Sequence, residues 1–269
     1  MRLGIGSYTY GWAADKSLTG PGGVITATEL LDRAARYHVE VVQIADNMPL
    51  HLLDVSQRTR LKEAARRKGI VLEIGTRGLT RENISRYIGI AAEMDSRILR
   101  VVIDAAGYEP DAAAVVSILR EIESLLEQSG VTLAIENHDR FKAAEIREIV
   151  EKCASARVGV CLDSVNSLGA AEGIESVTNC LAPYTVNLHI KDFMIKRLPY
   201  LMGFTVEGRP AGQGMLDIPR LVDTVSRFHP DASAILELWT PPEKEPGETL
   251  AKESQWAKES LAYLRTVIQ

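Results

Sequence analysis

The sequence predicts a single (β/α)₈ barrel that spans all 269 residues. Short β-rich runs recur along the whole chain, each is followed by a stretch of helical periodicity, and the repeat is roughly 30 residues, as βα units require. Barrels of this kind form one domain of about 200 to 250 residues or more. Since no Pro/Gly/Ser-rich tract divides the chain, we expect one domain over residues 1–269, with a doubly wound open sheet as the structural alternative.

The expected strands come first in each repeat. They are the apolar segments 3–7, 39–45, 70–75, 98–104, 131–136, 158–163, 185–191 and 233–239.

Helix start signals follow several of these strands. Thr26 and Glu29 match a capping box, in which the hydroxyl and the carboxylate satisfy each other's backbone N–H groups. Thr80 and Asp111 precede two further helices, and Gly130 follows the second of these as a stop signal. The stretch 249–268 is expected to form the eighth helix and to complete the outer ring.

Composition excludes several classes of protein. The net charge of −5 offers no basic excess for a phosphate backbone, so we expect no nucleic-acid partner. No apolar run reaches the roughly 18 residues of a membrane span, and the N-terminus lacks the apolar core of a secretory signal. The three cysteines are an odd number without CxxC spacing, so neither a disulfide framework nor a thiolate zinc site is expected. A cytoplasmic location fits best.

The last four expected strands each end in a residue that can bind a metal. These residues are Glu136, Asp163, His189 and Glu237. The carboxyl ends of barrel strands open onto one face, so the four side chains are expected to meet. Three converging carboxylates repel one another unless a cation neutralises them, which predicts one divalent metal. Three oxygens and one nitrogen suit Mn²⁺, Mg²⁺, Co²⁺ or Zn²⁺ and do not select among them.

Five segments around these residues resemble the xylose isomerase-like TIM barrel superfamily. They are IEN at 135–137, CLDSVN at 161–166, HIKD at 189–192, GRPAGQG at 208–214 and LEL at 236–238. The superfamily includes ketose 3-epimerases, inositol-pathway isomerases and dehydratases, hydroxypyruvate isomerases and apurinic endonucleases. The resemblance implies that the four strand-end residues bind the metal. It also implies that Glu136 and Glu237 transfer protons on opposite faces of a keto-sugar or sugar-acid substrate, with an enediolate between the two steps.

One position departs from the sugar epimerases of this group. They carry a histidine three residues after the strand-six aspartate, whereas this chain has Asn166, which can hydrogen-bond a hydroxyl but cannot exchange a proton as imidazole does. The leading prediction is therefore an isomerase or epimerase, and the main alternative is a 3-oxo-sugar-acid decarboxylase. An apurinic endonuclease is disfavoured by the acidic charge and by only five histidines, and a non-catalytic sugar-binding barrel would make the ligand set incidental.

Further residues are candidates for the substrate site, and each also has a structural interpretation. Lys191 is expected to donate to a substrate oxygen, with Asp192 as its partner or as a cap. His138 follows Glu136 closely and either contacts the substrate or the metal or is a loop histidine bonded to backbone. Tyr8 follows the first strand and either lines the pocket or packs in the loop.

Two arginines are candidate anion-binding residues. Arg77 follows strand three, and Arg209 lies in the glycine-rich loop, where backbone can approach a ligand closely. The structural alternative is a salt bridge across the barrel mouth for Arg77 and a solvated loop arginine for Arg209. Glu73 and Arg100 fall inside strands, so we expect them in a structural ion pair within the barrel.

The segment 193–207 is unusually apolar for a loop on the active face. Exposed apolar surface normally marks an interface. We therefore expect this loop to act as a lid over the substrate or as the contact of a homo-oligomer.

Overall fold

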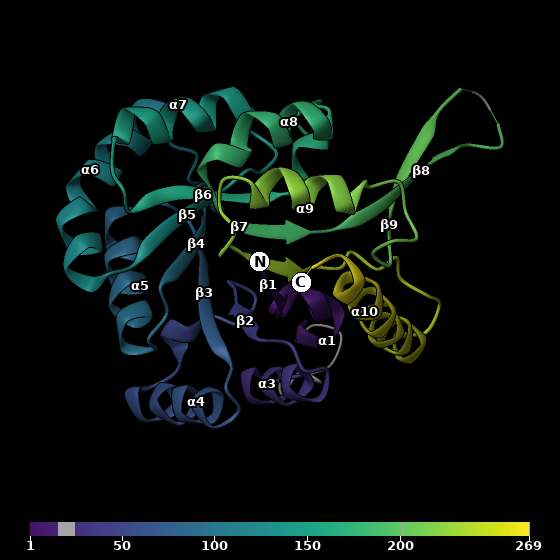
Figure 1. Cartoon of the computed structure of the whole chain (residues 1–269), viewed down its shortest axis with the longest axis horizontal. Coiled ribbons are helices and arrows are strands. Elements are labelled where there is room, and N and C mark those ends of the chain that lie inside the picture. Colours follow the sequence, from purple (N-terminus) through teal and green to yellow (C-terminus); the bar gives the residue numbers. More distant parts are fainter. Residues whose placement is uncertain (16–24, 201, 269) are drawn as a thin grey trace.

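Eight parallel strands close into a barrel in this computed structural model, which describes residues 1–15, 25–200 and 202–268 (Figure 1). Around the barrel the strands follow the order β1-β10-β7-β6-β5-β4-β3-β2. Their bounds are β1 (Arg2–Gly6), β2 (Val41–Ile44), β3 (Val71–Arg77), β4 (Ile98–Val102), β5 (Thr132–Glu136), β6 (Val158–Asp163), β7 (Thr185–Ile190) and β10 (Ser233–Leu236). The predicted (β/α)₈ barrel is confirmed.

A helix follows each barrel strand and packs on its outer side (Figure 1). These helices are α3 (Ala27–Arg36), α4 (Val55–Arg67), α5 (Arg81–Glu93), α6 (Ala112–Ser129), α7 (Ala143–Cys153), α8 (Ile174–Leu181), α9 (Ile218–Ser226) and α10 (Pro246–Val267). Short helical turns complete the connections: η1 (Ser7–Tyr10), α1 (Gly11–Ala14), η2 (Leu50–Leu52), η3 (Asn166–Leu168) and η4 (Ala182–Tyr184).

The predicted helix signals have their expected geometry. Thr26 and Glu29 form the capping box of α3, and the side chains of Thr80 and Asp111 accept backbone N–H groups at the starts of α5 and α6. Gly130 ends α6 at φ 66°, a left-handed conformation in which a side chain would be strained. Among the described residues, no helix combines the length and the apolar character that crossing a membrane would require.

Two layers of side chains with different chemistry pack against the sheet. Apolar side chains such as Val101, Leu133 and Leu188 are fully buried in the hydrophobic core, as burial of apolar surface favours. Polar side chains are also fully or almost fully buried, among them Gln43 and Asn187, which hydrogen-bond each other across the barrel. The barrel is thus closed around a polar centre, which positions the site described below.

Two strand predictions that bear on the site need correction at their C-terminal ends. Strand β3 continues to Arg77, so this residue ends the strand and does not follow it. Strand β10 already ends at Leu236, so Glu237 is the first residue beyond the strand.

The segment 193–207 is also not an irregular loop. It belongs to an antiparallel ribbon of β8 (Asp192–Arg197) and β9 (Phe204–Arg209), which projects away from the barrel (Figure 1); Leu201 lies outside the described residues. Ribbon pairing satisfies backbone groups that an open loop would leave to water, and Ile195 pairs with Val206 on it while both stay exposed. Its role as a lid or a subunit contact stays a prediction.

Candidate metal centre

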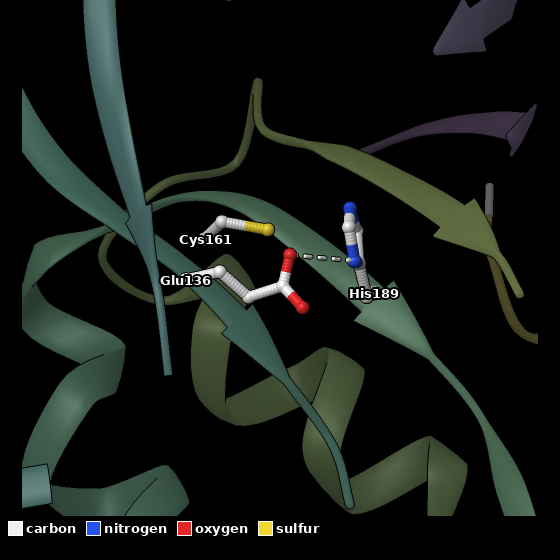
Figure 2. Close-up of side chains that lie close together, drawn as sticks. All are labelled: Glu136, Cys161 and His189. Carbon is white, nitrogen blue, oxygen red and sulfur yellow. Dashed lines mark ion pairs between the residues drawn. The ribbon is translucent and has the colours of Figure 1, made fainter. Parts of the chain in front are cut away.

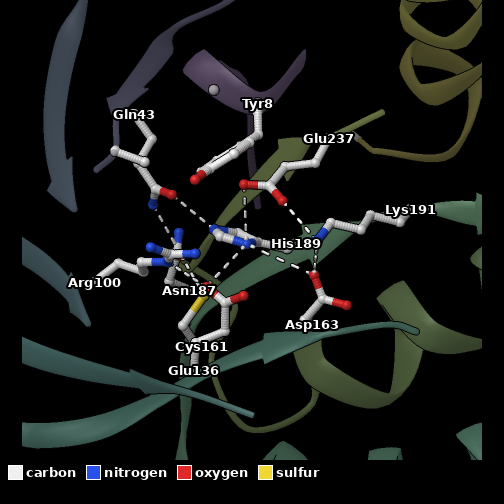
Figure 3. Close-up of polar contacts among 12 residues, drawn as sticks. Tyr8, Gln43, Arg100, Glu136, Cys161, Asp163, Asn187, His189, Lys191 and Glu237 are labelled. Carbon is white, nitrogen blue, oxygen red and sulfur yellow. Dashed lines mark hydrogen bonds and ion pairs between the residues drawn. The ribbon is translucent and has the colours of Figure 1, made fainter. Parts of the chain in front are cut away.

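The four side chains predicted at the strand ends do meet, at the centre of the barrel mouth (Figure 3). His189 Nδ1 lies 3.3 Å from Glu237 Oε1, 3.6 Å from Glu136 Oε2 and 3.9 Å from Asp163 Oδ2. Each of the four residues is at most 1% exposed. They come together because β5, β6, β7 and β10 are consecutive in the barrel, with Asp163 and His189 in register.

The donor atoms fit a divalent cation. Ligand atoms of Asp163, His189 and Glu237 all lie within 4.8 Å of one another. In the described part of the chain, His189 Nδ1 and Glu237 Oε1 have no hydrogen-bond partner, and Asp163 Oδ2 has only an ion pair. Buried polar atoms are normally satisfied, so orphaned atoms that face one another indicate a missing partner. A cation of the predicted kind satisfies all three, and its binding here stays a prediction.

Cys161 lies close to the same centre and was not predicted (Figure 2). Its ligand atom is within 4.8 Å of those of Glu136 and His189. Burial, reinforced by the charge of Glu136, raises the pKa of the Cys161 thiol well above its ordinary value. The neutral thiol lies 3.0 Å from Asn187 Oδ1, to which it donates, so it is a poor ligand beside the carboxylates.

Lys191 occupies the side of the centre away from Arg100 (Figure 3). Its Nζ lies 2.8 Å from Asp163 Oδ2 and 2.9 Å from Glu237 Oε2. Burial by itself lowers the pKa of Lys191, but the charges of Asp163, Glu237 and Glu136 outweigh it and raise that pKa above its ordinary value. Lys191 thus forms ion pairs with two of the expected ligands, and its catalytic role stays a prediction.

Asp192 is not the partner of Lys191. Its carboxylate is 1% exposed and accepts the backbone N–H groups of Phe193, Gly212, Gly214 and Leu216 at 2.8 to 3.1 Å. The glycine-rich loop thus wraps around a carboxylate of the protein itself, and a Cβ at Gly214 would lie 2.0 Å from Asp192 Oδ1. The close contact with Asp192 by itself explains these glycines, so they do not indicate that backbone approaches a substrate here.

Arg209 lies at the end of β9 and forms an ion pair with Glu207 at 3.0 Å. Its guanidinium also donates to the carbonyl of Gly208 at 2.6 Å. Both contacts lie within the ribbon, so an ion pair holds Arg209 where the structural alternative expected a solvated loop arginine, and its binding of an anion stays a prediction.

Arg100 and Glu73 are not paired with each other. The Arg100 guanidinium donates from Nε to Glu136 Oε2 and forms an ion pair with Asp46 at 2.7 Å, so it does hold an ion pair inside the barrel. Glu73 has no ion pair within residues 1–15, 25–200 and 202–268, and burial raises the pKa of its carboxyl group. The expectation of a Glu73 ion pair is wrong because amide groups, not a cation, surround this carboxyl group.

The Arg100 contact changes the character of Glu136. Burial would raise the pKa of Glu136, but the positive charges of Arg100, His189 and Lys191 hold it below its ordinary value. Asn166 Nδ2 donates to the other oxygen, Glu136 Oε1, at 2.8 Å. Asn166 therefore contacts one of the expected ligands, while its substrate-binding role stays a prediction, and Glu136 is ionised with hydrogen bonds to both oxygens.

Asp46 is a site residue that the sequence reasoning missed. It follows β2 and joins Arg100, Arg77 and Tyr8: its Oδ2 lies 3.2 Å from Arg77 Nε and accepts the Tyr8 hydroxyl at 3.1 Å. Burial raises its pKa less than Arg100 and Arg77 lower it, so this carboxylate is ionised. Its position just after a strand was the available signal.

Arg77 and Tyr8 thus lie at the edge of the centre, held by Asp46. The Arg77 side chain is 36% exposed, which leaves the guanidinium open toward solvent. Burial and the Asp46 charge raise the pKa of Tyr8, so its hydroxyl stays protonated. His138 Nδ1 lies 3.2 Å from Asp139 Oδ2, a side-chain partner where the loop-histidine interpretation expects a backbone one, and its contact with substrate or metal stays a prediction.

The family described as the xylose isomerase-like TIM barrel matches residues 27–267. This chain belongs to that family. Among curated proteins, a 3-oxo-isoapionate decarboxylase of Pectobacterium atrosepticum is 31% identical over 266 residues, which cover 99% of this chain and 96% of the relative.

Solved structures show the same fold. A D-psicose 3-epimerase determined in the presence of D-fructose has a TM-score of 0.75 at 16% identity and covers 100% of this chain and 99% of its own. A family member from Mycobacterium smegmatis in complex with magnesium has a TM-score of 0.72 at 13% identity, covering 98% and 97%. The predicted family is confirmed. The proteins that this chain resembles include an epimerase and a decarboxylase, so the reaction has to be argued from the site.

Proposed function

We propose that this protein is a divalent-metal-dependent decarboxylase of a small 3-oxo sugar acid. The observation that carries the proposal is the environment of Glu136, whose two oxygens are hydrogen-bonded by Arg100 and Asn166. An epimerase of the kind that the resemblance implies needs two carboxylates that can each take a proton. Decarboxylation needs no such pair, because the bond that breaks is a C–C bond.

The relative at 31% identity supports the same reaction class. That relative is a 3-oxo-isoapionate decarboxylase, and the match extends over nearly the whole of both chains. The substitution of Asn166 for the epimerase histidine agrees with it, because Asn166 orients Glu136 without exchanging a proton.

Glu136, Asp163, His189 and Glu237 would hold the metal, which would supply Lewis-acid stabilisation of negative charge on the substrate. A magnesium complex among the solved relatives makes Mg²⁺ one candidate beside Mn²⁺, Co²⁺ and Zn²⁺. Since the donors are three oxygens and one nitrogen, this chain's residues leave the choice among these ions to experiment.

Arg77 and Lys191 would have separate roles in the reaction. Arg77, open to solvent beside Asp46, would bind the substrate carboxylate as it enters. As the C–C bond to the carboxylate breaks, CO₂ leaves and the electron pair stays on the neighbouring carbon, delocalised onto the 3-oxo oxygen. Lys191 Nζ, which is held by Asp163 and Glu237, would then donate a proton to that carbon.

The proposal is tested by assaying CO₂ release and solvent-deuterium incorporation with panels of 3-oxo sugar acids and keto-sugars, with and without chelator. A decarboxylase releases CO₂ and places one deuteron on the carbon that lost it. Deuterium exchange into keto-sugars without any CO₂ would overturn the proposal in favour of an isomerase.

An isomerase or epimerase of a keto-sugar is the second candidate. The observation that favours it is the placement of Glu136 and Glu237 on different sides of His189 (Figure 3), as transfer on two faces of a substrate requires. Glu237 Oε1 has no hydrogen bond in the part of the chain that the structure describes and can act as a base. The same two assays separate this candidate from the first.

A further inference from the structure

A buried layer of amide and carboxyl groups lies next to His189, on the side away from the carboxylates. It consists of Gln43 from β2, Glu73 from β3 and Asn187 from β7, each at most 1% exposed. Gln43 Oε1 lies 2.7 Å from His189 Nε2, and Figure 3 shows Gln43 pointing at the imidazole from across the barrel. None of these three residues belongs to the ligand set, yet Gln43 contacts the one nitrogen ligand, and Glu73 and Asn187 contact Gln43.

The orientation of the Gln43 amide is determined by its neighbours. Its Nε2 donates to Glu73 Oε2 at 3.2 Å and to Asn187 Oδ1 at 3.0 Å. Asn187 is oriented in turn, because its Nδ2 donates to Glu73 Oε2 at 3.0 Å and to Ser233 Oγ at 2.7 Å. With both N–H groups used, Gln43 can present only its oxygen to His189.

An oxygen at this position decides where a neutral His189 carries its proton. Gln43 Oε1 accepts only if His189 Nε2 bears the hydrogen, which leaves the lone pair on Nδ1. The opposite side of the ring favours the other tautomer, since Glu237 Oε1 and Glu136 Oε2 lie 3.3 and 3.6 Å from Nδ1 and would accept a proton from it. A proton on Nδ1 would block metal ligation, so the two sides of the ring compete.

We propose that Gln43, oriented by Glu73 and Asn187, is a positioning residue that holds His189 as the Nε2–H tautomer and so keeps Nδ1 free to bind the metal. The inference rests on the metal centre proposed above. It assigns a role to three buried polar residues for which the reaction itself has no use, in the way that partners of a metal-bound histidine fix its tautomer.

The tautomer can be read directly by ¹⁵N–¹H correlation NMR of the metal-free protein at alkaline pH. The His189 signals are those lost in His189→Gln. Wild type should show the proton on Nε2, and Gln43→Met, which removes the acceptor, should move it to Nδ1. Gln43→Glu restores an acceptor and should restore the wild-type pattern. Ser233→Ala, a control that loses a hydrogen bond of the same layer without touching Gln43, should leave the tautomer unchanged.

Metal affinity gives the second readout. Calorimetric titration with Zn²⁺ should show binding weakened about tenfold to hundredfold in Gln43→Met, with Gln43→Glu and Ser233→Ala close to wild type. Should Gln43→Met fail to fold, Glu73→Met removes one of the two acceptors that orient Gln43 and should shift the tautomer and the affinity in the same direction.

The outcomes separate this inference from the proposed metal centre. A wild-type His189 protonated on Nδ1, or on both nitrogens throughout the alkaline range, overturns the inference even if Zn²⁺ binds tightly. An Nε2–H tautomer that survives in the folded Gln43→Met or Glu73→Met variant also overturns it. Failure of the wild type to bind Zn²⁺, Mn²⁺ or Mg²⁺ would refute the metal centre, while the NMR result would still decide the role of Gln43.

Discussion

The two halves of the barrel contribute different chemistry to its centre. Strands β5, β6, β7 and β10 deliver the four expected ligands, together with Lys191 just beyond β7. The half built from β1 to β4 instead supplies groups that act on those ligands: Arg100 on Glu136, and Gln43 on His189. The comparison teaches that one half presents the donor atoms, while the other half adds a buried guanidinium and an amide that bear on their charge and orientation.

Removing one of the four expected metal ligands should give the largest effect. It tests whether the half built from β5, β6, β7 and β10 defines the metal centre. In Glu237→Gln one carboxylate charge is lost, so the purified protein should retain little metal and lose turnover entirely. The fold should persist, because Glu237 lies beyond the end of β10. Metal analysis, the decarboxylation assay and thermal unfolding check the three statements. Full metal retention with normal activity would remove Glu237 from the site.

Removing the buried Arg100 guanidinium tests whether the ligands depend on the half of the barrel built from β1 to β4. Arg100→Met leaves Glu136 and Asp46 without their shared partner, which should lower the free energy of unfolding by about 3 to 5 kcal/mol. The control is Arg227→Met, which breaks an exposed pair with Asp223 and should cost at most about 0.5 kcal/mol. Urea unfolding of both variants makes the comparison. If Arg100→Met loses no more unfolding free energy than Arg227→Met, the stability of the barrel does not depend on the Arg100 ion pairs.

The loop after β1, which carries Tyr8, is anchored by Glu253 of α10, and this anchor predicts a pH dependence. Glu253 accepts the N–H groups of Trp12 and Ala13 at 2.9 and 3.1 Å, and burial raises its pKa from 4.5 to about 7. Because the folded-state pKa is the higher one, the contribution of Glu253 to stability is fully present below pH 4.5 and is lost as pH rises through about 7.

Glu253→Gln should therefore flatten the pH profile. Across this window the wild type should lose on the order of 3 kcal/mol of unfolding free energy that the variant does not lose. Urea unfolding of both proteins at a series of pH values measures the difference. Parallel profiles for the two proteins would show that Glu253 titrates at its ordinary value.

The smallest expected effect concerns Arg77, at the edge of the metal centre. Arg77→Gln removes the partly exposed cation proposed to bind the substrate carboxylate, so KM for a 3-oxo acid should rise about tenfold or more while kcat changes little. Arg209→Gln is the matched control, since that guanidinium is held within the ribbon by Glu207. Steady-state kinetics of both variants would measure KM and kcat and so show which of the two arginines binds the substrate carboxylate. A larger change in Arg209→Gln would move the anion site to the ribbon.

The barrel and the cluster of expected ligands could both be predicted from the sequence, for the same physical reason. Hydrophobic periodicity is local, so the alternation of strands and helices can be read along the chain, and a polar residue that ends an apolar run is visible without coordinates. The bounds of β3 and β10 were off by one to three residues, because pairing with neighbouring strands decides where a strand ends. The ribbon of β8 and β9 was missed because an apolar segment on a loop does not reveal its pairing partner.

By itself, then, the sequence determined the fold class, the family resemblance and which side chains converge, since these depend on local pattern and on the common direction of parallel strands. Only the tertiary structure decided that Arg100 pairs with Glu136 and Asp46 and not with Glu73, and that Asp192 organises the glycine-rich loop. It also placed Gln43 against His189, 146 residues away along the chain. Such pairs join residues distant in sequence, and their geometry is set by closure of the barrel, which no local pattern records.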